Sequence, residues 1–280
     1  YAAGVSAQLK SAVILAGLNS NGTTKIIEKI KSRDHTENLL KKNIKSINIK
    51  NGKKKIISVN GKKNLDKIKL NVTGDPSSSA FFTALTLLNK NSSIKINNVG
   101  LNPTRTGFYH LLKKQNAKIK FINIKKENNE LKGDILVKSC KLKPFKTTGH
   151  IYPSTADEFP ILFVMAGLVK GVSIFKGISD LANKESNRIK EMQKVLKQIG
   201  IKTVSKKDEL QIYGKGMIDA RDKTINVQGL KDHRIYMASF ILALLTGSSA
   251  KLKGFETVFT SSPSFLKIMK TLGAKFEIQS

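Results

Sequence analysis

Arginine is scarce in this chain, and its few positions are the first sign of chemistry. The chain holds 50 Lys and Arg residues, and only five of them are arginine. A guanidinium is a planar, two-pronged donor that matches carboxylate and phosphate geometry, which the ammonium group of lysine cannot do. Four of the five lie in short polar clusters beside apolar segments: Arg33, Arg105, Arg188 and Arg234. We expect these four to bind an anionic ligand, with pairing to structural carboxylates as the alternative.

Two groups of charged residues could carry proton transfer. Asp157 and Glu158 come directly before a long apolar segment. They are therefore predicted at the start of a buried helix, where burial raises a carboxyl pKa and favours general-base chemistry. Lys184, Glu185 and Arg188 lie at the next predicted helix start, where Glu185 and Arg188 share one helix face. The alternative for this second group is an ordinary surface ion pair.

The polar clusters fall at predicted helix starts, where free backbone N–H groups and the helix dipole attract anions. A single Ser or Asp at such a position is usually only an N-cap. Four starts of this kind, most with an arginine or a carboxylate, predict that several helix ends converge on one polyanionic ligand. No spacing of His, Cys and carboxylate resembles a metal site, and no glycine-rich phosphate loop is present. We expect no metal and no cofactor.

The elements that must position these residues recur along the chain. Almost wholly apolar helices, predicted to be buried all round, begin near Ser6, Ser77, Asp157 and Asp232, at steps of 71, 80 and 75 residues. A short strand-like run follows each of them. Half-exposed, amphipathic helices then begin near Ser32, Pro103, Glu185 and Ser261. Four matched pairs of helices indicate a fourfold internal repeat.

Two alternating runs after each of the first three copies predict a β-hairpin, as at Lys55–Val59 and Ile68–Val72. The predicted fold is therefore α/β, built from repeated β-α-β-α-β-β units with buried helices. The first copy is expected to begin at its helix without a strand, and the fourth stops at residues 276–280 before its hairpin. Both ends predict an architecture that is incomplete at the N-terminus.

Length and composition limit the remaining alternatives. A chain of 280 residues holds one large domain or two ordinary ones. The longest apolar run, residues 159–169, is too short to span a bilayer, and a single cysteine, Cys140, excludes an internal disulfide framework. We expect a cytoplasmic protein without a membrane partner. The net charge of +30 comes from lysines spread along the whole chain, and the aromatic residues lie mostly in apolar segments, so a nucleic-acid partner is not favoured.

Seven motifs give the chain a specific resemblance. They are, in order, Val5–Ala12, Ser32–Glu37, Gly74–Ala80, Asn102–Gly107, Asp157–Pro160, Lys184–Arg188 and Asp232–Arg234. Together they resemble the EPSP synthase (3-phosphoshikimate 1-carboxyvinyltransferase) family of aromatic amino-acid biosynthesis, from Tyr1 to Ser280. The resemblance implies a monomer with two domains, each of three such units, and an active site between them. Residues 1–72 would be the C-terminal part of the first, shikimate-phosphate-side domain, and residues 73–280 most of the second.

The resemblance also implies roles for single residues. Shikimate-3-phosphate would be held by Ser6, Ala7, Gln8, Ser32, Arg33, Asp157 and Lys184. Phosphoenolpyruvate would be held by Gln8, Arg188 and Arg234. Asp157 would accept the proton of the 5-hydroxyl as its oxygen attacks C2 of phosphoenolpyruvate, and Glu185 would give a proton to C3. About a third of the enzyme would be absent, so the 280 residues alone are expected to be inactive.

One departure and two alternatives remain open. The position before Arg188, usually acidic in the family, is Asn187, which predicts weaker carboxylate support for Arg188. UDP-N-acetylglucosamine enolpyruvyl transferase resembles the same fold and uses the same donor, but it carries a reactive cysteine on a mobile loop, whereas Cys140 ends a strand-like run. The alternative from another class is a basic nucleic-acid-binding module, whose DNA binding would fall steeply with salt and would not depend on Asp157.

Overall fold

The structure is a computed structural model that describes residues 1–4, 6–41 and 45–278. Val5, the first residue of the first motif, lies outside these ranges. The first unit forms one sheet in the order β1-β2-β4-β3, in which β1 is parallel to β2 and β4 is antiparallel to both neighbours. Its elements are β1 (Ala2–Ala3), α1 (Ala7–Asn19), β2 (Thr23–Glu28), α2 (His35–Leu40), β3 (Ile47–Lys50) and β4 (Lys55–Asn60).

The third unit repeats this order, as β8-β9-β11-β10, with the same parallel and antiparallel pairings. Its elements are β8 (Lys146–Thr147), α5 (Phe159–Gly167), β9 (Gly171–Lys176), α6 (Arg188–Gln198), β10 (Lys202–Lys206) and β11 (Glu209–Gly214). Two 3-10 helices, Gly149–Ser154 and Ser179–Asn183, lead into its helices α5 and α6. The same order in two distant segments confirms the predicted β-α-β-α-β-β unit.

The other two units are shortened copies. In the second, a parallel bridge between Gly74 and Val99 takes the place of the first strand, and the sheet has the order β5-β7-β6. Its elements are α3 (Pro76–Leu88), β5 (Ser93–Gly100), α4 (Gly107–Lys114), β6 (Ile119–Glu127) and β7 (Glu130–Lys138). The fourth has β12 (Thr224–Val227) parallel to β13 (Ser249–Leu252), with α7 (His233–Thr246), the 3-10 helix Phe255–Val258 and α8 (Phe265–Thr271).

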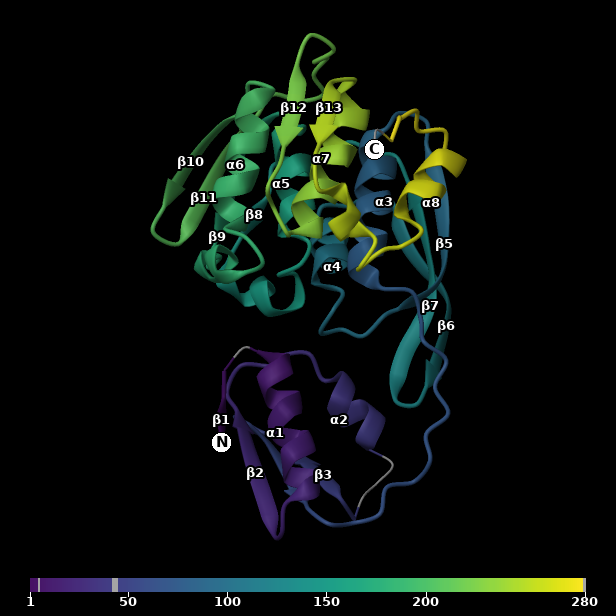
Figure 1. The fold of residues 1–280 in the computed structure, drawn as a ribbon, viewed down its shortest axis with the longest axis vertical. Helices are drawn as coiled ribbons and strands as arrows, with labels where there is room; N and C mark the ends of the chain where they lie inside the picture. The colour runs from purple at the N-terminus through teal and green to yellow at the C-terminus, as the bar shows by residue number, and fades with distance from the viewer. Residues whose placement is uncertain (5, 42–44, 279–280) are drawn as a thin grey trace.

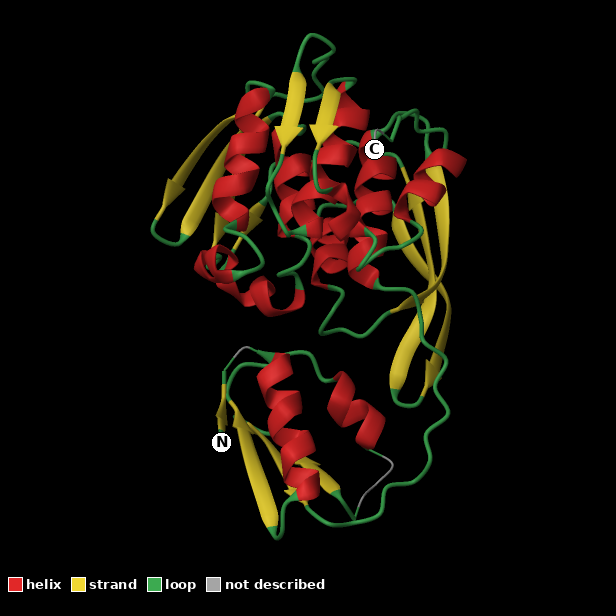
Figure 2. Ribbon diagram, viewed as in Figure 1, coloured by secondary structure: helices red, strands yellow, loops and turns green. Residues whose placement is uncertain are grey.

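The four units form two lobes with separate hydrophobic cores (Figure 1). The small lobe, residues 1–60, has a core of Ile14, Ile26, Leu40, Ile47, Ile57 and Val59. The large lobe, residues 74–278, is built around α3, α5 and α7, which pack against one another and are covered by the sheets (Figure 2). An extended connector, residues 61–73, joins the lobes. In the ranges described, no helix has the length and apolarity needed to cross a membrane.

Three expectations from the sequence are wrong in detail. Ile68–Val72 forms no strand, since both of its faces are exposed in the connector and it joins none of the described sheets. The hairpin partner of β4 is instead Ile47–Lys50, across the Asn51–Gly52 turn. The first copy does have a strand before its helix, Ala2–Ala3. Finally, α1 is not buried all round, since Leu9 is 60% exposed and Leu15 is 53% exposed.

The helix starts are fixed by local chemistry. Asp75 caps α3 by accepting from the Ser78 N–H at 2.9 Å, and Pro76 occupies the first turn, where a missing N–H costs nothing. Asp232 caps α7 by accepting from the Arg234 N–H at 3.0 Å. The N-terminal ends of α3, α5 and α7 face the small lobe (Figure 1). The fold therefore gathers three helix starts at the boundary between the lobes.

Candidate active site

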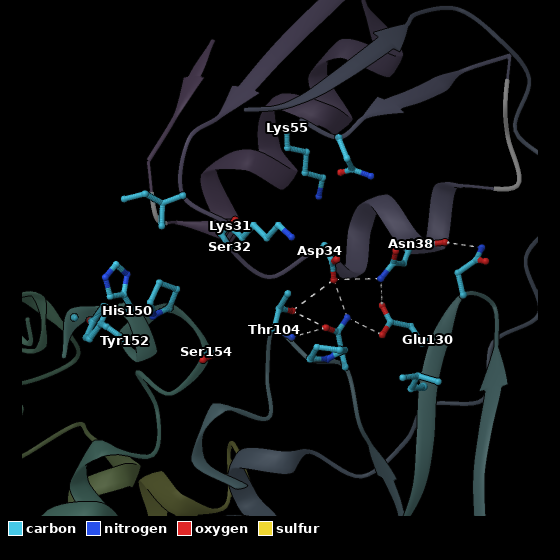
Figure 3. Close-up of a pocket in the computed structure, with 18 of the residues that line it drawn as sticks. Lys31, Ser32, Asp34, Asn38, Lys55, Thr104, Glu130, His150, Tyr152 and Ser154 are labelled. Carbon is cyan, nitrogen blue, oxygen red and sulfur yellow. Dashed lines mark hydrogen bonds between the residues drawn. The ribbon is translucent and has the colours of Figure 1, made fainter. Parts of the chain in front are cut away.

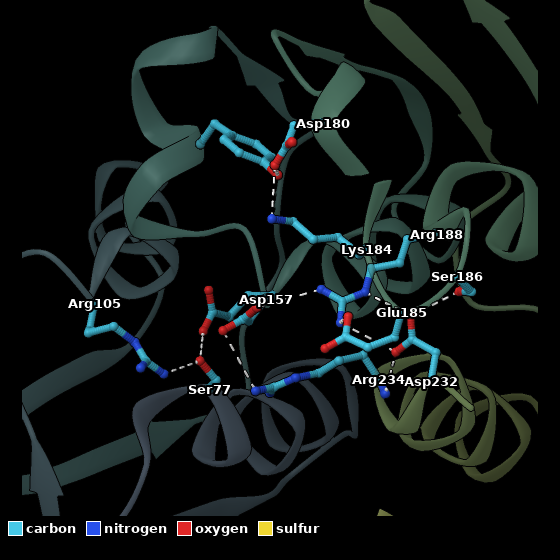
Figure 4. A network of polar contacts seen from close by, with 12 residues as sticks. Ser77, Arg105, Asp157, Asp180, Lys184, Glu185, Ser186, Arg188, Asp232 and Arg234 are labelled. Carbon is cyan, nitrogen blue, oxygen red and sulfur yellow. Dashed lines mark hydrogen bonds and ion pairs between the residues drawn. The ribbon is translucent and has the colours of Figure 1, made fainter. Parts of the chain in front are cut away.

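Asp157, just before α5, is the point where three predicted site arginines meet, and Figure 4 shows two of them, Arg188 and Arg234. Arg33 of the small lobe donates from Nη2 to Asp157 Oδ2 at 2.5 Å. Arg188 Nη1 lies 3.5 Å from Asp157 Oδ1, and Arg234 Nη2 lies 3.8 Å from Oδ2. The structure thus brings together four residues that lie up to 201 positions apart in the chain, from Arg33 to Arg234.

Arg188 is buried, with 1% of its side chain exposed, and it is held by three carboxylates. Its Nε donates to Asp232 at 2.9 Å and its Nη2 to Glu185 at 2.7 Å, in addition to the contact with Asp157. The expectation of weaker carboxylate support is therefore wrong. Asn187 instead caps α6 by accepting from the Lys190 N–H, and Asp232, 44 residues further along, replaces the acidic neighbour.

Donor groups are left over in this cluster. Among the described residues, Arg188 Nη1 and Arg234 Nε and Nη1 are buried without a hydrogen-bond partner. Buried polar groups in folded proteins are almost always paired, so each exception calls for an explanation. Guanidinium donors beside a carboxylate fit the oxygens of a carboxylate or phosphate ligand. The arrangement can therefore bind an anion next to Asp157.

Asp157 and Glu158 are adjacent, yet their charge states differ. Burial would raise the pKa of Asp157, but Arg234, Arg33 and Arg105 together hold it well below its usual range. Burial, together with the neighbouring Asp157 charge, raises the pKa of Glu158 to about 7. The raised pKa expected at this helix start therefore belongs to Glu158, and Asp157 is ionised at neutral pH.

Lys184 and Glu185 approach the cluster from the segment before α6 (Figure 4). Lys184 Nζ lies 2.8 Å from Asp180 Oδ2, which also accepts from the Tyr152 hydroxyl at 2.5 Å. Glu185 is half-exposed and reaches Arg188. Sequence reasoning missed Asp180 and Tyr152. The only signal for Asp180 was its spacing of four residues before Lys184.

Ser6, Ala7 and Gln8 lie at the start of α1, where Ser6 caps the helix by accepting from the Leu9 N–H at 3.4 Å. Gln8 is exposed. Within the described part of the chain, none of the three contacts Asp157, Arg188 or Arg234. The structure therefore does not bring the Ser6–Gln8 segment into the arginine cluster.

Ser32 is held in place by hydrogen bonds to Glu28. Its N–H and its hydroxyl both donate to Glu28 Oε1, at 2.9 and 2.6 Å. Glu28 belongs to a buried quartet of two lysines and two glutamates: Lys10, Glu28, Glu37 and Lys55. Because both donors of Ser32 are taken by Glu28, Ser32 in this state has none to offer a phosphate. Arg33, the next residue, is the one that reaches across to the large lobe.

A cavity of about 1330 Å³ lies between the lobes (Figure 3). Its walls include Ser32 and Lys55 of the small lobe and Tyr152 and Asp180 of the large lobe. Direct hydrogen bonds join the two lobes beside it. These run from Asn102 to Asp34 at 2.8 Å, from Asn38 to Glu130 at 3.1 Å and between His35 and Glu130 at 3.0 Å. Ligands in this cavity would touch both lobes.

The described residues contain no group of three or more His, Cys, Asp or Glu side chains arranged to hold a metal ion. Cys140 follows β7 and packs, partly buried, against the core of the large lobe. It is absent from the described residues that line the cavity between the lobes. The site is thus made of guanidinium, ammonium, carboxylate and hydroxyl groups.

Comparison with known proteins identifies the class to which this fold belongs. The enolpyruvyl transferase NikO from Streptomyces tendae shares the fold, with a TM-score of 0.70 over 94% of this chain and 58% of that chain, at 13% identity. The chain therefore has the enolpyruvyl transferase fold. More narrowly, it belongs to the EPSP synthase (3-phosphoshikimate 1-carboxyvinyltransferase) family, whose model matches residues 1–269. This confirms the resemblance carried by the seven motifs.

Individual relatives agree with the family assignment. The 3-phosphoshikimate 1-carboxyvinyltransferases of Zymomonas mobilis and Petrotoga mobilis are 37% and 40% identical over 98% and 95% of this chain. The EPSP synthase of Acinetobacter baumannii superposes with a TM-score of 0.88 over the whole chain, at 33% identity. The chain spans 61% of the length of the two sequence relatives and 63% of the chain in that structure.

Proposed function

We propose that this protein transfers the enolpyruvyl group of phosphoenolpyruvate to the 5-hydroxyl of shikimate-3-phosphate and releases inorganic phosphate, as a step of aromatic amino-acid biosynthesis. The observation that carries the proposal is the cluster of Arg33, Arg188 and Arg234 around Asp157, in which Arg188 and Arg234 are buried. The unpaired donors of Arg188 and Arg234 suit the carboxylate and phosphate of phosphoenolpyruvate. The names of the relatives point to the same reaction.

The charges in the cluster suggest how Asp157 becomes a base. Without a ligand, the arginines hold the pKa of Asp157 low, so it is a weak proton acceptor. An anion that takes up the charge of Arg188 and Arg234 would weaken this effect and raise the basicity of Asp157. Asp157 would then accept the 5-hydroxyl proton only when phosphoenolpyruvate is bound.

The remaining steps use the roles that the family resemblance implies. The 5-oxygen would bond to C2 of phosphoenolpyruvate while Glu185 gives a proton to C3. These two events together would form a tetrahedral adduct. The adduct then loses a proton from C3 and its C2–phosphate bond breaks, so that the product keeps the enol double bond. Arginines and helix starts fixed in advance around the reacting atoms would stabilise the shifting negative charge. No cofactor takes part in this scheme.

Other assignments belong to the same proposal. Residues 1–72 would be the C-terminal part of the first domain and residues 73–280 most of the second, which the two separate hydrophobic cores support. Gln8 and Ser6 would contact the ligands from the small-lobe side, and Lys184 would hold the shikimate ring. We further propose a monomer in the cytoplasm.

Replacing Arg234 by Met tests the anion site. The change keeps the size of a side chain that is 6% exposed but removes a charged donor, so phosphoenolpyruvate affinity is expected to fall about 10- to 100-fold. Isothermal titration calorimetry, with shikimate-3-phosphate present, measures this change. Arg221→Met is the matched control, because the Arg221 side chain is 80% exposed in a surface pair with Asp219. Equal affinities in the two variants would rule out Arg234 as a ligand.

Turnover is measured separately, because the chain spans only part of the length of its relatives. A chimera in which this chain replaces the matching 61% of the Zymomonas mobilis relative is expected to release phosphate from phosphoenolpyruvate when shikimate-3-phosphate is present. The 280-residue chain alone is expected to bind without turnover. A folded chimera that binds both substrates and releases no phosphate would contradict the proposed function.

A further inference from the structure

Glu158 is a buried carboxyl that the proposed reaction leaves unused. It is 2% exposed and stands at the N-terminal end of α5, next to Asp157. Asp157 is surrounded by arginines, but no cation forms an ion pair with Glu158 in the described ranges of the chain. Its contact is a hydrogen bond from the hydroxyl of Ser77, in the first turn of α3. A carboxyl in this position keeps a proton far more readily than its neighbour does.

Ser77 connects Glu158 to the anion site. Its Oγ accepts from Arg105 Nη2 at 2.7 Å, and the same Nη2 donates to Asp75 at 2.6 Å. Asp75 in turn lies 3.9 Å from Arg234 Nη2. The contacts therefore run from Glu158 through Ser77, Arg105 and Asp75 to one of the two arginines with unpaired donors, and Figure 4 shows the contact between Arg105 and Ser77.

The groups around Glu158 decide what its charge would do. Burial and Asp157 disfavour its ionisation, whereas Ser77, Arg234 and Arg105 favour it, and together they leave its pKa at about 7. Tyr109 of α4 is also close, but its hydroxyl donates to the Pro76 carbonyl at 3.0 Å. Protonated Glu158 leaves Asp157 as the single anion at this helix start. Ionised Glu158 adds a second one, which competes with any ligand for Arg105 and Arg234.

We propose that Glu158 is a positioning residue that switches the anion site. When Glu158 is protonated, Arg105 and Arg234 are free to bind an anionic ligand. When Glu158 is ionised, these arginines are drawn toward α5 through Ser77 and Asp75. The identity of the ligand as phosphoenolpyruvate rests on the proposed function, but the switch itself concerns any dianion at Arg188 and Arg234. Affinity for such an anion is therefore expected to fall as the pH rises through about 7.

Calorimetry on the 280-residue chain tests the switch with two probes. One probe is phosphoenolpyruvate, and the other is sulfate, whose charge stays constant between pH 6 and pH 8.5. We expect the affinity of the unmodified chain for sulfate to fall about tenfold over this range, as one buried charge appears near the site. In Glu158→Gln, which mimics the protonated carboxyl, the affinity should stay at the pH 6 value throughout. Glu256→Gln, at an exposed carboxyl, should behave like the unmodified chain.

The possible results of this experiment either support or overturn the switch at Glu158. A pH step that persists in Glu158→Gln, or no step in the unmodified chain, would overturn the switch. A fall in sulfate affinity with pH that is absent from Glu158→Gln supports the switch. If phosphoenolpyruvate fails to bind in the same experiment, that failure counts against the proposed function alone. If Glu158→Gln does not fold, Ser77→Ala keeps the question open to test. It removes a hydrogen bond that favours ionised Glu158, so the midpoint of the step should move to higher pH.

Stability gives an independent readout. The pKa of Glu158 rises from 4.5, its ordinary value, to about 7 on folding. Its contribution to stability is therefore fully present below pH 4.5 and is lost as the pH rises through about 7. The urea midpoint of Glu158→Gln should exceed that of the unmodified chain at pH 8.5, with the difference shrinking toward pH 5. Equal midpoints at both pH values would show that Glu158 is not held in its protonated form by the fold.

Discussion

Replacing Asp157 by Asn is expected to make anions bind more tightly while turnover collapses. The substitution removes the carboxylate shared by Arg33, Arg188 and Arg234 but keeps the shape of the side chain. The guanidinium charges then lose one of their internal carboxylate partners, so a dianion beside them should bind about tenfold more tightly. Loss of a general base costs about 10²- to 10⁴-fold in rate, and we expect kcat to fall by that factor.

This prediction is specific because anion affinity and kcat are expected to change in opposite directions. Calorimetry on the 280-residue chain gives the affinity for phosphoenolpyruvate, and phosphate release by the chimera gives kcat. Asp219→Asn is the control, because Asp219 is an exposed carboxylate paired with an arginine on the surface. Affinity and turnover that fall together in Asp157→Asn would mean that Asp157 only binds substrate.

The repeat could be predicted from the sequence because it depends on local patterns of capping and apolar spacing. Apolar helices are predicted to begin near Ser77, Asp157 and Asp232, and α3, α5 and α7 each begin within two residues of those points. Capping and helical periodicity depend on residues within a few positions of each other, so they can be recognised without tertiary information. The same reasoning explains why the arginine clusters at helix starts were recognised as candidates.

Long-range contacts account for what the sequence did not reveal. Both donors of Ser32 go to Glu28 at the end of β2, which is paired with Lys10 of α1, and no local pattern encodes that quartet. Burial acts on both neighbours, and the arginines brought to Asp157 from distant parts of the chain separate its charge state from that of Glu158. Likewise, Ile68–Val72 alternates like a strand but stays exposed and joins none of the described sheets, so alternation alone overpredicted a strand.

Replacing Lys10 by Met is expected to have the largest effect on stability in the small lobe. Lys10 is completely buried, and its Nζ lies 2.8 Å from both Glu28 Oε1 and Glu37 Oε1. Without it, Lys55 alone faces two buried carboxylates, since Glu28 and Glu37 are 2% and 1% exposed. Removing one partner of a buried ion pair typically costs about 3–5 kcal/mol, because an uncompensated charge remains in the interior.

The hydrophobic core of the small lobe is small, so its apolar packing can offset little of this loss of stability. Urea unfolding, followed by amide hydrogen exchange in β2 and β4, should show the small lobe opening at much lower denaturant while the large lobe keeps its protection. Lys194→Met is the control, because Lys194 forms an exposed surface pair with Glu191. The double variant Lys10→Met/Glu28→Gln should recover part of the stability by removing one of the two stranded charges. Equal unfolding of Lys10→Met and Lys194→Met would mean that the quartet neither holds the lobe together nor positions the segment that reaches Asp157.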